Sequence, residues 1–199
     1  MGIWDERYGE GGFAYGTKPN GFLAEFSRVF PKGGKILSLG EGEGRNAVYL
    51  AARGHVVTAL DQSPVGLLKA QERARQEGLK LATVTADLAD FDLGREAWDG
   101  ILSIWCHLPS ALRRSVHEQV AAALKPGGIF LLEAYGPRQL EFRTGGPQNP
   151  DQLADLAALQ GELAGLEWIY AEEIEREVHE GKYHNGRSAV IQLIGKKPA

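Results

Sequence analysis

Short apolar runs alternate with amphipathic helical patterns along most of this chain. The apolar runs predict five strands, at residues 35–39, 56–61, 81–85, 101–105 and 129–132. Apolar residues spaced three and four apart predict helices at residues 22–30, 45–53, 64–78 and 110–124, and one that opens at Asn149-Pro150. Asn20, Ser63 and Ser110 stand where N-caps belong, and Pro64 occupies a first helical position.

The end of the chain has a different pattern. Residues 168–178 and 189–194 resemble two antiparallel strands, and Asn185-Gly186 is a typical hairpin turn between them. Alternating strands and helices followed by a hairpin predict an α/β fold. Its sheet is mostly parallel and seven-stranded, with an antiparallel C-terminal hairpin at one edge and helices on both faces.

The most informative local motif is the turn that follows the first predicted strand. Gly40, Gly42 and Gly44 alternate with Glu41 and Glu43, and a helical pattern begins at once. Such turns let a ligand approach the backbone at the carboxyl end of a strand. A carboxylate ~4 Å from a bound pyrophosphate would cost several kcal/mol, so the two glutamates disfavour a dinucleotide. A cofactor with cationic groups is favoured instead, although a purely structural turn is the simpler alternative.

Asp61 completes this pattern. It ends the second predicted strand about 20 residues after the glycine turn, where a carboxylate can accept hydrogen bonds from both ribose hydroxyls. Arg45 stands where the third glycine of a dinucleotide fingerprint would fall. Asp61 could alternatively cap a turn, but the linked pair of motifs favours binding of an adenosine.

With these motifs in place, the chain resembles the class I S-adenosylmethionine (SAM) dependent methyltransferases, whose fold is Rossmann-like. The matching segments are residues 39–44, Asp61, residues 86–88 and residues 124–128. Residues 4–8, Tyr15-Gly16 and Pro19-Asn20 resemble the small bacterial branch of tellurite-resistance and thiopurine methyltransferases. Ser38 departs from the family, which usually has an acidic residue there, and Glu41 is the candidate to replace it.

The resemblance implies SAM as cofactor, S-adenosylhomocysteine (SAH) as product and a small soluble methyl acceptor. It implies that Asp87 accepts from the adenine amino group while the Leu88 amide lies near a ring nitrogen. The full set of cofactor-binding candidates is Trp4, Tyr8, Tyr15, Gly40, Glu41, Gly42, Gly44, Asn46, Asp61, Gln62, Asp87, Leu88 and Trp105.

The acceptor side has fewer signals. His107 follows the fourth predicted strand and is either a general base or a hydrogen-bonded loop histidine. Methyl transfer to a soft anion needs no base, so the enzyme can lack a catalytic residue in the strict sense. The candidates for the acceptor pocket are Cys106, Glu133, Tyr135, Arg138 and Arg143.

The first residues form a glycine-rich segment with Trp4, Tyr8, Phe13 and Tyr15. We expect a lid that folds over the cofactor, with plain packing on the sheet as the alternative. The expected organisation is therefore one domain, residues 1–199. It comprises a lid and helix at 1–34, a cofactor-binding core at 35–135, and a substrate loop, helix and hairpin at 136–199.

Composition limits the partners. The 199 residues are 43% hydrophobic and 24% charged, with a net charge of −4 and no dense basic run, so we expect no nucleic acid partner. Cys106 is the single cysteine, which suits a reducing compartment, and no apolar run could span a bilayer. We expect a cytoplasmic protein with no metal. Two other functions remain open: a SAM- or SAH-binding regulator without catalysis, and a nicotinamide-dependent oxidoreductase.

Overall fold

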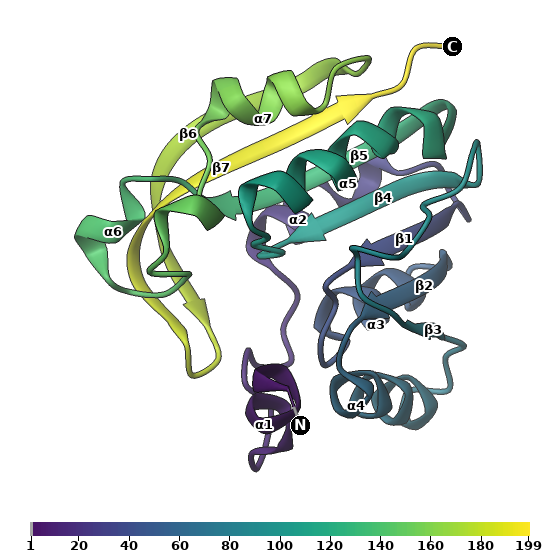
Figure 1. Ribbon diagram of the computed structural model, residues 1–199. Helices are drawn as coiled ribbons and strands as arrows, with labels where there is room; N and C mark the ends of the chain where they lie inside the picture. The colour runs from purple at the N-terminus through teal and green to yellow at the C-terminus, as the bar shows by residue number, and fades with distance from the viewer. Residues whose placement is uncertain (1) are drawn as a thin grey trace.

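The computed structural model describes residues 2–199; Met1, the first residue of the expected lid, lies outside the described residues. A single twisted sheet crosses the molecule (Figure 1). Its strands are β1 (Lys35–Leu39), β2 (Val56–Asp61), β3 (Ala82–Thr85), β4 (Trp98–Ile104), β5 (Leu124–Tyr135), β6 (Glu167–Glu180) and β7 (His184–Lys196).

The strand order is β3-β2-β1-β4-β5-β7-β6, in one seven-stranded sheet. Strands β1 to β5 pair in parallel, whereas β7 pairs antiparallel with both β5 and β6. The order reverses between β1 and β4, so a crevice is expected there at the carboxyl ends of the strands. The predicted fold class is confirmed.

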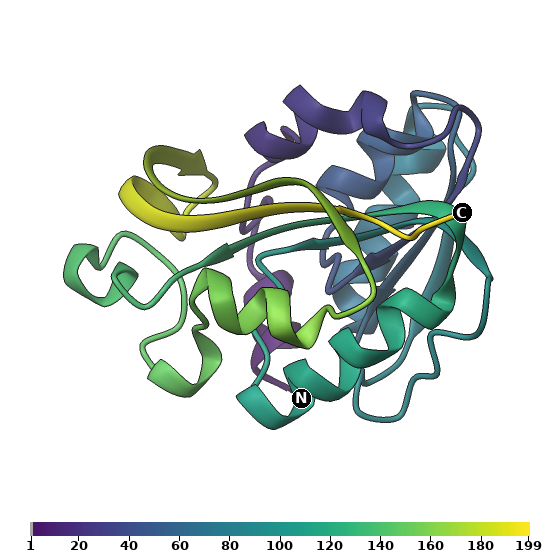
Figure 2. The same cartoon turned by 90° about the horizontal axis from the view of Figure 1, so that it is seen from above.

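Helices cover both faces of the sheet (Figure 2). They are α1 (Ile3–Gly9), α2 (Gly21–Phe26), η1 (Ser27–Val29), α3 (Arg45–Ala51), α4 (Pro64–Gln76), α5 (Ser110–Ala123), α6 (Gln139–Phe142), η2 (Pro150–Gln152) and α7 (Leu156–Glu162). One apolar layer joins α2, α3 and α4 to the sheet through residues such as Leu23, Leu50 and Leu67. The other joins α5 and α7 to it through Val116, Val120 and Leu159.

Two predicted helices are interrupted. The pattern at 22–30 gives α2 and then a separate 3-10 turn, η1. The helix expected from Asn149-Pro150 stops after η2, and α7 begins afresh where the Asp155 side chain accepts from the Ala158 amide. In both segments the apolar residues do face the protein interior, as the spacing predicted. The spacing does not show where the helical backbone hydrogen bonds are interrupted.

The predicted position of the hairpin turn was also wrong. Strands β6 and β7 run on to Glu180 and His184, and the residues between them form the turn, with Gly181 at φ 68°. Asn185-Gly186 instead lies inside β7, paired with Val178 and His179. Ser110 was expected to cap α5 but is its first residue, and its side chain bonds Asp151.

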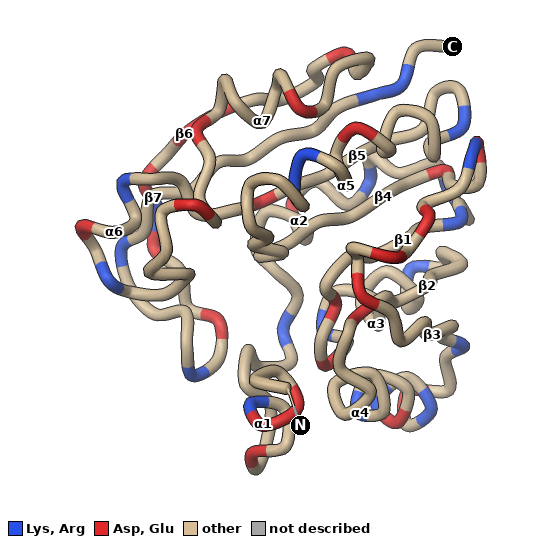
Figure 3. The backbone as a smooth tube through the Cα atoms, viewed as in Figure 1, with Lys and Arg blue, Asp and Glu red and all other residues tan. Residues whose placement is uncertain are grey.

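Charges are spread over many elements, with Lys and Arg interspersed among Asp and Glu (Figure 3). Within residues 2–199, no helix is both long and apolar enough to cross a membrane.

Candidate functional site

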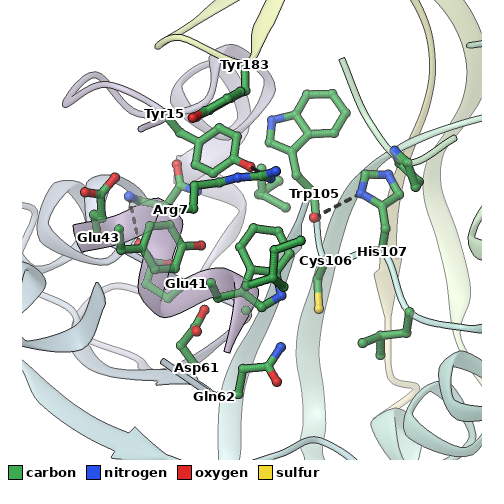
Figure 4. A pocket seen from close by; sticks show the side chains of 18 of the residues that line it. Arg7, Tyr15, Glu41, Glu43, Asp61, Gln62, Trp105, Cys106, His107 and Tyr183 are labelled. Carbon is green, nitrogen blue, oxygen red and sulfur yellow. Dashed lines mark hydrogen bonds between the residues drawn. The ribbon is translucent and has the colours of Figure 1, made fainter. Parts of the chain in front are cut away.

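A cavity of about 480 Å³ lies at the carboxyl ends of β1, β2, β3 and β4. This volume is within the ordinary range for small-molecule sites. Thirteen of the predicted site residues line it: Trp4, Tyr8, Tyr15, Gly40, Glu41, Asn46, Asp61, Gln62, Asp87, Leu88, Trp105, Cys106 and His107. Figure 4 shows Asp61 and Gln62 at one end of it, and Arg7, Tyr15 and Tyr183 gathered at the other.

The three glycine positions of the turn leave no room for a side chain. Gly40, Gly42 and Gly44 all have positive φ, at 59°, 62° and 85°. A Cβ atom on Gly40 would lie 2.9 Å from the Cys106 sulfur, and one on Gly42 would lie 2.6 Å from the Tyr8 hydroxyl. Glycine is therefore required here both by the backbone conformation and by close packing.

Glu41 is buried within the turn. One carboxylate oxygen accepts from the Asn46 and Ala47 amides at the start of α3, at 3.0 and 2.9 Å, and the other accepts from the Ser38 hydroxyl. Burial raises the pKa of Glu41 above its ordinary value, against these hydrogen bonds. The Ser38 hydroxyl thus helps to orient the Glu41 carboxylate, and the replacement of the family's acidic residue by Glu41 stays a prediction.

Glu43 ties the N-terminal segment to the turn. It accepts from the Ala14 amide at 2.7 Å and from Lys69 Nζ at 2.8 Å. Lys69 also donates to the Gly12 carbonyl at 2.8 Å. The second carboxylate of the motif is therefore neutralised, and its neighbours hold the residues that follow α1 against the site.

Asp61 ends β2 with its carboxylate at the cavity. It accepts from the Gly42 amide and the Ser63 amide, both at 2.8 Å. Burial raises its pKa although both hydrogen bonds favour the ionised form. Each oxygen retains a further lone pair, so the side chain can still bind two ribose hydroxyls. The exposed Asp87 also reaches the cavity and accepts from the Ala89 amide at 2.9 Å.

The N-terminal segment contains a helix that the sequence pattern did not predict. Tyr8 on α1 is 4% exposed and stacks on Trp4 at 5.7 Å between ring centroids. Arg7 donates to the Tyr15 hydroxyl at 2.9 Å, and its guanidinium lies 4.6 Å from the centre of the Tyr183 ring. The segment therefore covers the cavity and contacts the tip of the β6–β7 hairpin.

The segment after β4 forms the next wall of the cavity. Trp105 has φ 55°, an unusual backbone conformation for a tryptophan, and its indole donates to Glu180 at 2.6 Å. Its ring stacks on Tyr135 at 4.3 Å. Burial raises the pKa of the neighbouring Cys106 thiol to about 12, so the thiol stays protonated at neutral pH.

The geometry of His107 favours the second of its two interpretations. Its Nδ1 lies 3.0 Å from the Trp105 carbonyl, and its Nε2 accepts from the Tyr135 amide at 2.9 Å. Burial lowers its pKa to about 4, against the hydrogen bond from Nδ1. With both nitrogens engaged, the imidazole has no free lone pair to receive a proton from an acceptor.

The remaining acceptor candidates do not line the cavity. Glu133 is fully buried and bonds Arg176, Gln192 and Asn20. Arg138 pairs with Glu175 on the surface, and Arg143 is absent from the cavity wall. Tyr135 stacks on Trp105 and does not line the cavity. Of the predicted cofactor residues, Gly42 and Gly44 belong to the glycine turn but do not line the cavity either.

The cavity residues that were not singled out for the site include Arg7, Arg45, Tyr183 and His184. Arg7 lay within the segment quoted for the family resemblance, so that segment was an available signal for it. Tyr183 and His184 lie at the tip of the β6–β7 hairpin, beyond the 14 residues of β6. No local sequence pattern indicated that this tip reaches the site. Across residues 2–199, no cluster of three or more His, Cys, Asp or Glu residues is placed to hold a metal ion.

Comparison with known proteins agrees with this geometry. Residues 36–128 match the family model for a methyltransferase domain. The 2-heptyl-1-hydroxyquinolin-4(1H)-one methyltransferase of Mycobacteroides abscessus is 31% identical over 104 residues, covering 50% of this chain and 45% of that protein. The matches span less than half the length of the curated relatives.

Solved structures share the fold. TehB from Haemophilus influenzae has a TM-score of 0.74 at 20% identity, over 89% of this chain and 62% of that one. A SAM-dependent methyltransferase from Methanosarcina mazei has a TM-score of 0.71 at 18% identity, over 87% and 97%. Residues 36–128 are thus similar to a methyltransferase domain, and the chain shares the fold of a solved SAM-dependent methyltransferase.

Proposed function

We propose that the chain is a single-domain SAM-dependent methyltransferase that transfers a methyl group to a small soluble acceptor. The observation that carries this proposal is the pairing of the glycine turn, whose Glu41 lines the cavity, with Asp61, whose side chain meets that turn through the Gly42 amide. This arrangement suits an adenosine linked to a cationic group and opposes a pyrophosphate.

The adenosine half of SAM would lie over β2 and β3. Asp61 would accept from both ribose hydroxyls, with Gln62 beside it on the cavity wall. Asp87 would accept from the adenine amino group, and the Leu88 amide would lie near a ring nitrogen.

The methionine half would lie over β1 and β4. Its carboxylate requires a cation, and two arginines line the cavity. Arg45 is paired with Glu180 at 2.5 Å, whereas Arg7 has no carboxylate partner among residues 2–199 and contacts only aromatic groups. We therefore assign the carboxylate to Arg7 and the amino group to Glu41.

When bound, SAM supplies an electrophilic methyl group on a sulfonium, which passes to the acceptor by in-line displacement. The chain contributes alignment of the two reactants, which can supply ~7–11 kcal/mol of the barrier reduction in favourable cases. Trp4, Tyr8 and Tyr15 exclude water from the site. The role of His107 in this scheme is to hold Trp105 and Tyr135 in place through its two hydrogen bonds.

Titration calorimetry with SAH and NADH tests the cofactor assignment. We expect SAH to bind with micromolar or tighter affinity and NADH to bind poorly; tighter binding of NADH would support the oxidoreductase alternative. Turnover of SAM with a panel of acceptors, starting with the hydroxyquinolinone named for the relative, separates an enzyme from a binding-only regulator. Binding of SAH without methylation of any acceptor in the panel would favour the regulator.

A further inference from the structure

The cavity wall holds a buried histidine that the fold does not use. His184 begins β7 at the hairpin tip, lines the cavity and is only 5% exposed. Its Nδ1 has no hydrogen-bond partner within the described chain. A buried polar atom left without a partner costs about 1–3 kcal/mol, so its presence needs an explanation.

His107 makes the contrast clear. Both histidines are close to Trp105 and Tyr135, but both ring nitrogens of His107 are hydrogen-bonded to the backbone. His107 is therefore explained by the local structure, and His184 is not. A half-turn of the His184 ring about its Cβ–Cγ bond exchanges Nδ1 with the carbon edge, so a nitrogen can face either side.

The surroundings of His184 are those of a binding pocket for a flat molecule. Its ring lies 4.7 Å from that of Tyr15 and 5.2 Å from that of Trp105, measured between centroids. The loop at Gly145 and Gly146 covers the cluster so closely that a Cβ atom on Gly145 would lie 2.9 Å from the His184 ring. The Tyr15 ring is tilted by 49° to that of His184 and the Trp105 ring by 74°, so this wall presents both faces and edges of aromatic rings, which favour an aromatic, and therefore planar, ligand.

The position of His184 separates it from the contacts proposed for the adenosine half of the cofactor. The glycine turn, Asp61 and Asp87 follow β1, β2 and β3, whereas β7 lies beyond β4 and β5 in the sheet. The hairpin tip therefore faces the opposite end of the cavity, next to Trp105. A ligand at that end would meet the aromatic walls and the His184 imidazole.

The charge at that end is low. Burial lowers the pKa of His184 to about 3, so its ring is neutral at neutral pH. Arg45 is paired with Glu180, and Arg7 is assigned above to the methionine carboxylate. The end of the cavity beside His184 thus offers a hydrogen-bonding group and aromatic rings, but no unpaired cation that could bind an oxyanion.

We propose that His184 is the acceptor-binding residue of this site, and that it selects a planar, uncharged acceptor with a hydrogen-bonding group over a charged oxyanion. The inference rests on the proposed function, because it requires the adenosine half of the cofactor over β2 and β3 and its methionine half over β1 and β4, which leaves the space beside His184 for the acceptor. The inference specifies the chemical class of the acceptor and the residue that binds it.

The test measures, by titration calorimetry, the binding of three probes to SAH-saturated protein: 7-hydroxycoumarin with its hydroxyl protonated, coumarin, which lacks that hydroxyl, and coumarin-3-carboxylate. We expect 7-hydroxycoumarin to bind about fivefold tighter than coumarin, equivalent to ~1 kcal/mol for one hydrogen bond. The carboxylate should bind more weakly than 7-hydroxycoumarin. Calorimetry with SAH, done first, tests the proposed function separately.

Variants assign the preference to one side chain. His184→Phe keeps the aromatic packing and should abolish the difference between the two neutral probes, while His184→Gln should restore part of it. His179→Phe, on the same hairpin but exposed, is the matched control and should behave as the native protein. Affinity for SAH should change less than twofold in all three.

Three results would overturn the inference while SAH binding stays intact: an unchanged preference in His184→Phe, no binding of either neutral probe to the native protein, or tighter binding of the carboxylate. Failure of the native protein to bind SAH would overturn both the inference and the proposed function.

Discussion

Asp61 shows how a single carboxylate connects the fold to the cofactor. Its two oxygens already bind the Gly42 and Ser63 amides, so the residue orders the glycine turn and faces the cavity at once. A substitution therefore affects binding through direct contacts and through the turn. This dual role makes Asp61 the most informative residue to change.

Asp61→Ala should weaken SAM binding by about 1.5–3 kcal/mol, because hydrogen bonds to a charged group are lost. Titration calorimetry measures the change. Asp90→Ala is the control, since Asp90 is exposed in the loop after β3 and does not line the cavity. An unchanged dissociation constant for a folded Asp61→Ala protein would place Asp61 outside the cofactor site.

Arg7→Met tests the other end of the cofactor. The variant keeps much of the apolar side chain but removes the charge, so SAH should bind about tenfold more weakly, or ~1.4 kcal/mol. 5′-Methylthioadenosine lacks the amino acid group and should bind equally to both proteins. Calorimetry with the two ligands separates a carboxylate contact from a general effect on the lid, which would weaken both.

At the scale of elements, a buried ionic cluster joins α5 to α7. Glu162 on α7 accepts from Arg113 at 3.0 Å and lies 2.9 Å from His117 Nδ1, both on α5. Burial alone would raise the pKa of Glu162, but the hydrogen bonds from His117 and Arg113 lower it to about 2. The cluster fixes the helix pair that covers one face of the sheet.

A depressed carboxyl pKa contributes stability that is complete above the unfolded value near 4.5 and is lost as pH falls toward 2. Glu162→Gln should therefore destabilise the protein at neutral pH by about 3 kcal/mol, since it leaves the buried Arg113 cation unpaired. It should also flatten the dependence of stability on pH between these values. Urea unfolding at several pH values measures both effects.

Glu72→Gln is the matched control. Glu72 also has a pKa lowered to about 2, by hydrogen bonds from Arg75 and Gln76, but it is fully exposed. Exposed ion pairs are screened by water, so this variant should unfold almost as the native protein does. Equal effects of the two substitutions would contradict the importance of burial at Glu162.

At the scale of the whole molecule, the N-terminal segment and the tip of the β6–β7 hairpin meet over the cavity. The Tyr183 hydroxyl donates to Glu10 at 2.8 Å, and the Lys182 amide donates to the Ala14 carbonyl at 2.7 Å. Glu43 anchors the same segment from the glycine turn. The lid is thus held by contacts from two distant parts of the sequence, and its mobility without cofactor stays a prediction.

Removal of residues 1–16 should leave the sheet folded, because no strand is shortened. SAM binding should weaken about tenfold, ~1.4 kcal/mol, and any methyl transfer should fall further as water enters the site. Hydrogen exchange of residues 2–16, with and without SAH, is the direct measurement. Protection that does not change with SAH would mean that the aromatic residues are ordinary packing.

Much of the architecture could be predicted from the sequence because it depends on neighbours in the chain. The glycine turn and its positive φ values follow from Gly40, Gly42 and Gly44. The caps at Asn20 and Ser63 are confirmed, each accepting from the amide three residues later. The alternation of strands and helices then specified the parallel core, because each segment carries its own periodicity.

The tertiary structure alone decided how the acceptor end is built. The sequence singled out His107 and not His184, and only packing shows that both ring nitrogens of His107 are hydrogen-bonded whereas Nδ1 of His184 is not. The contact between Glu10 and Tyr183 joins residues 173 positions apart. Local sequence determines backbone conformation and capping, whereas contacts of this kind depend on how the completed sheet brings its edges and the chain's first residues together.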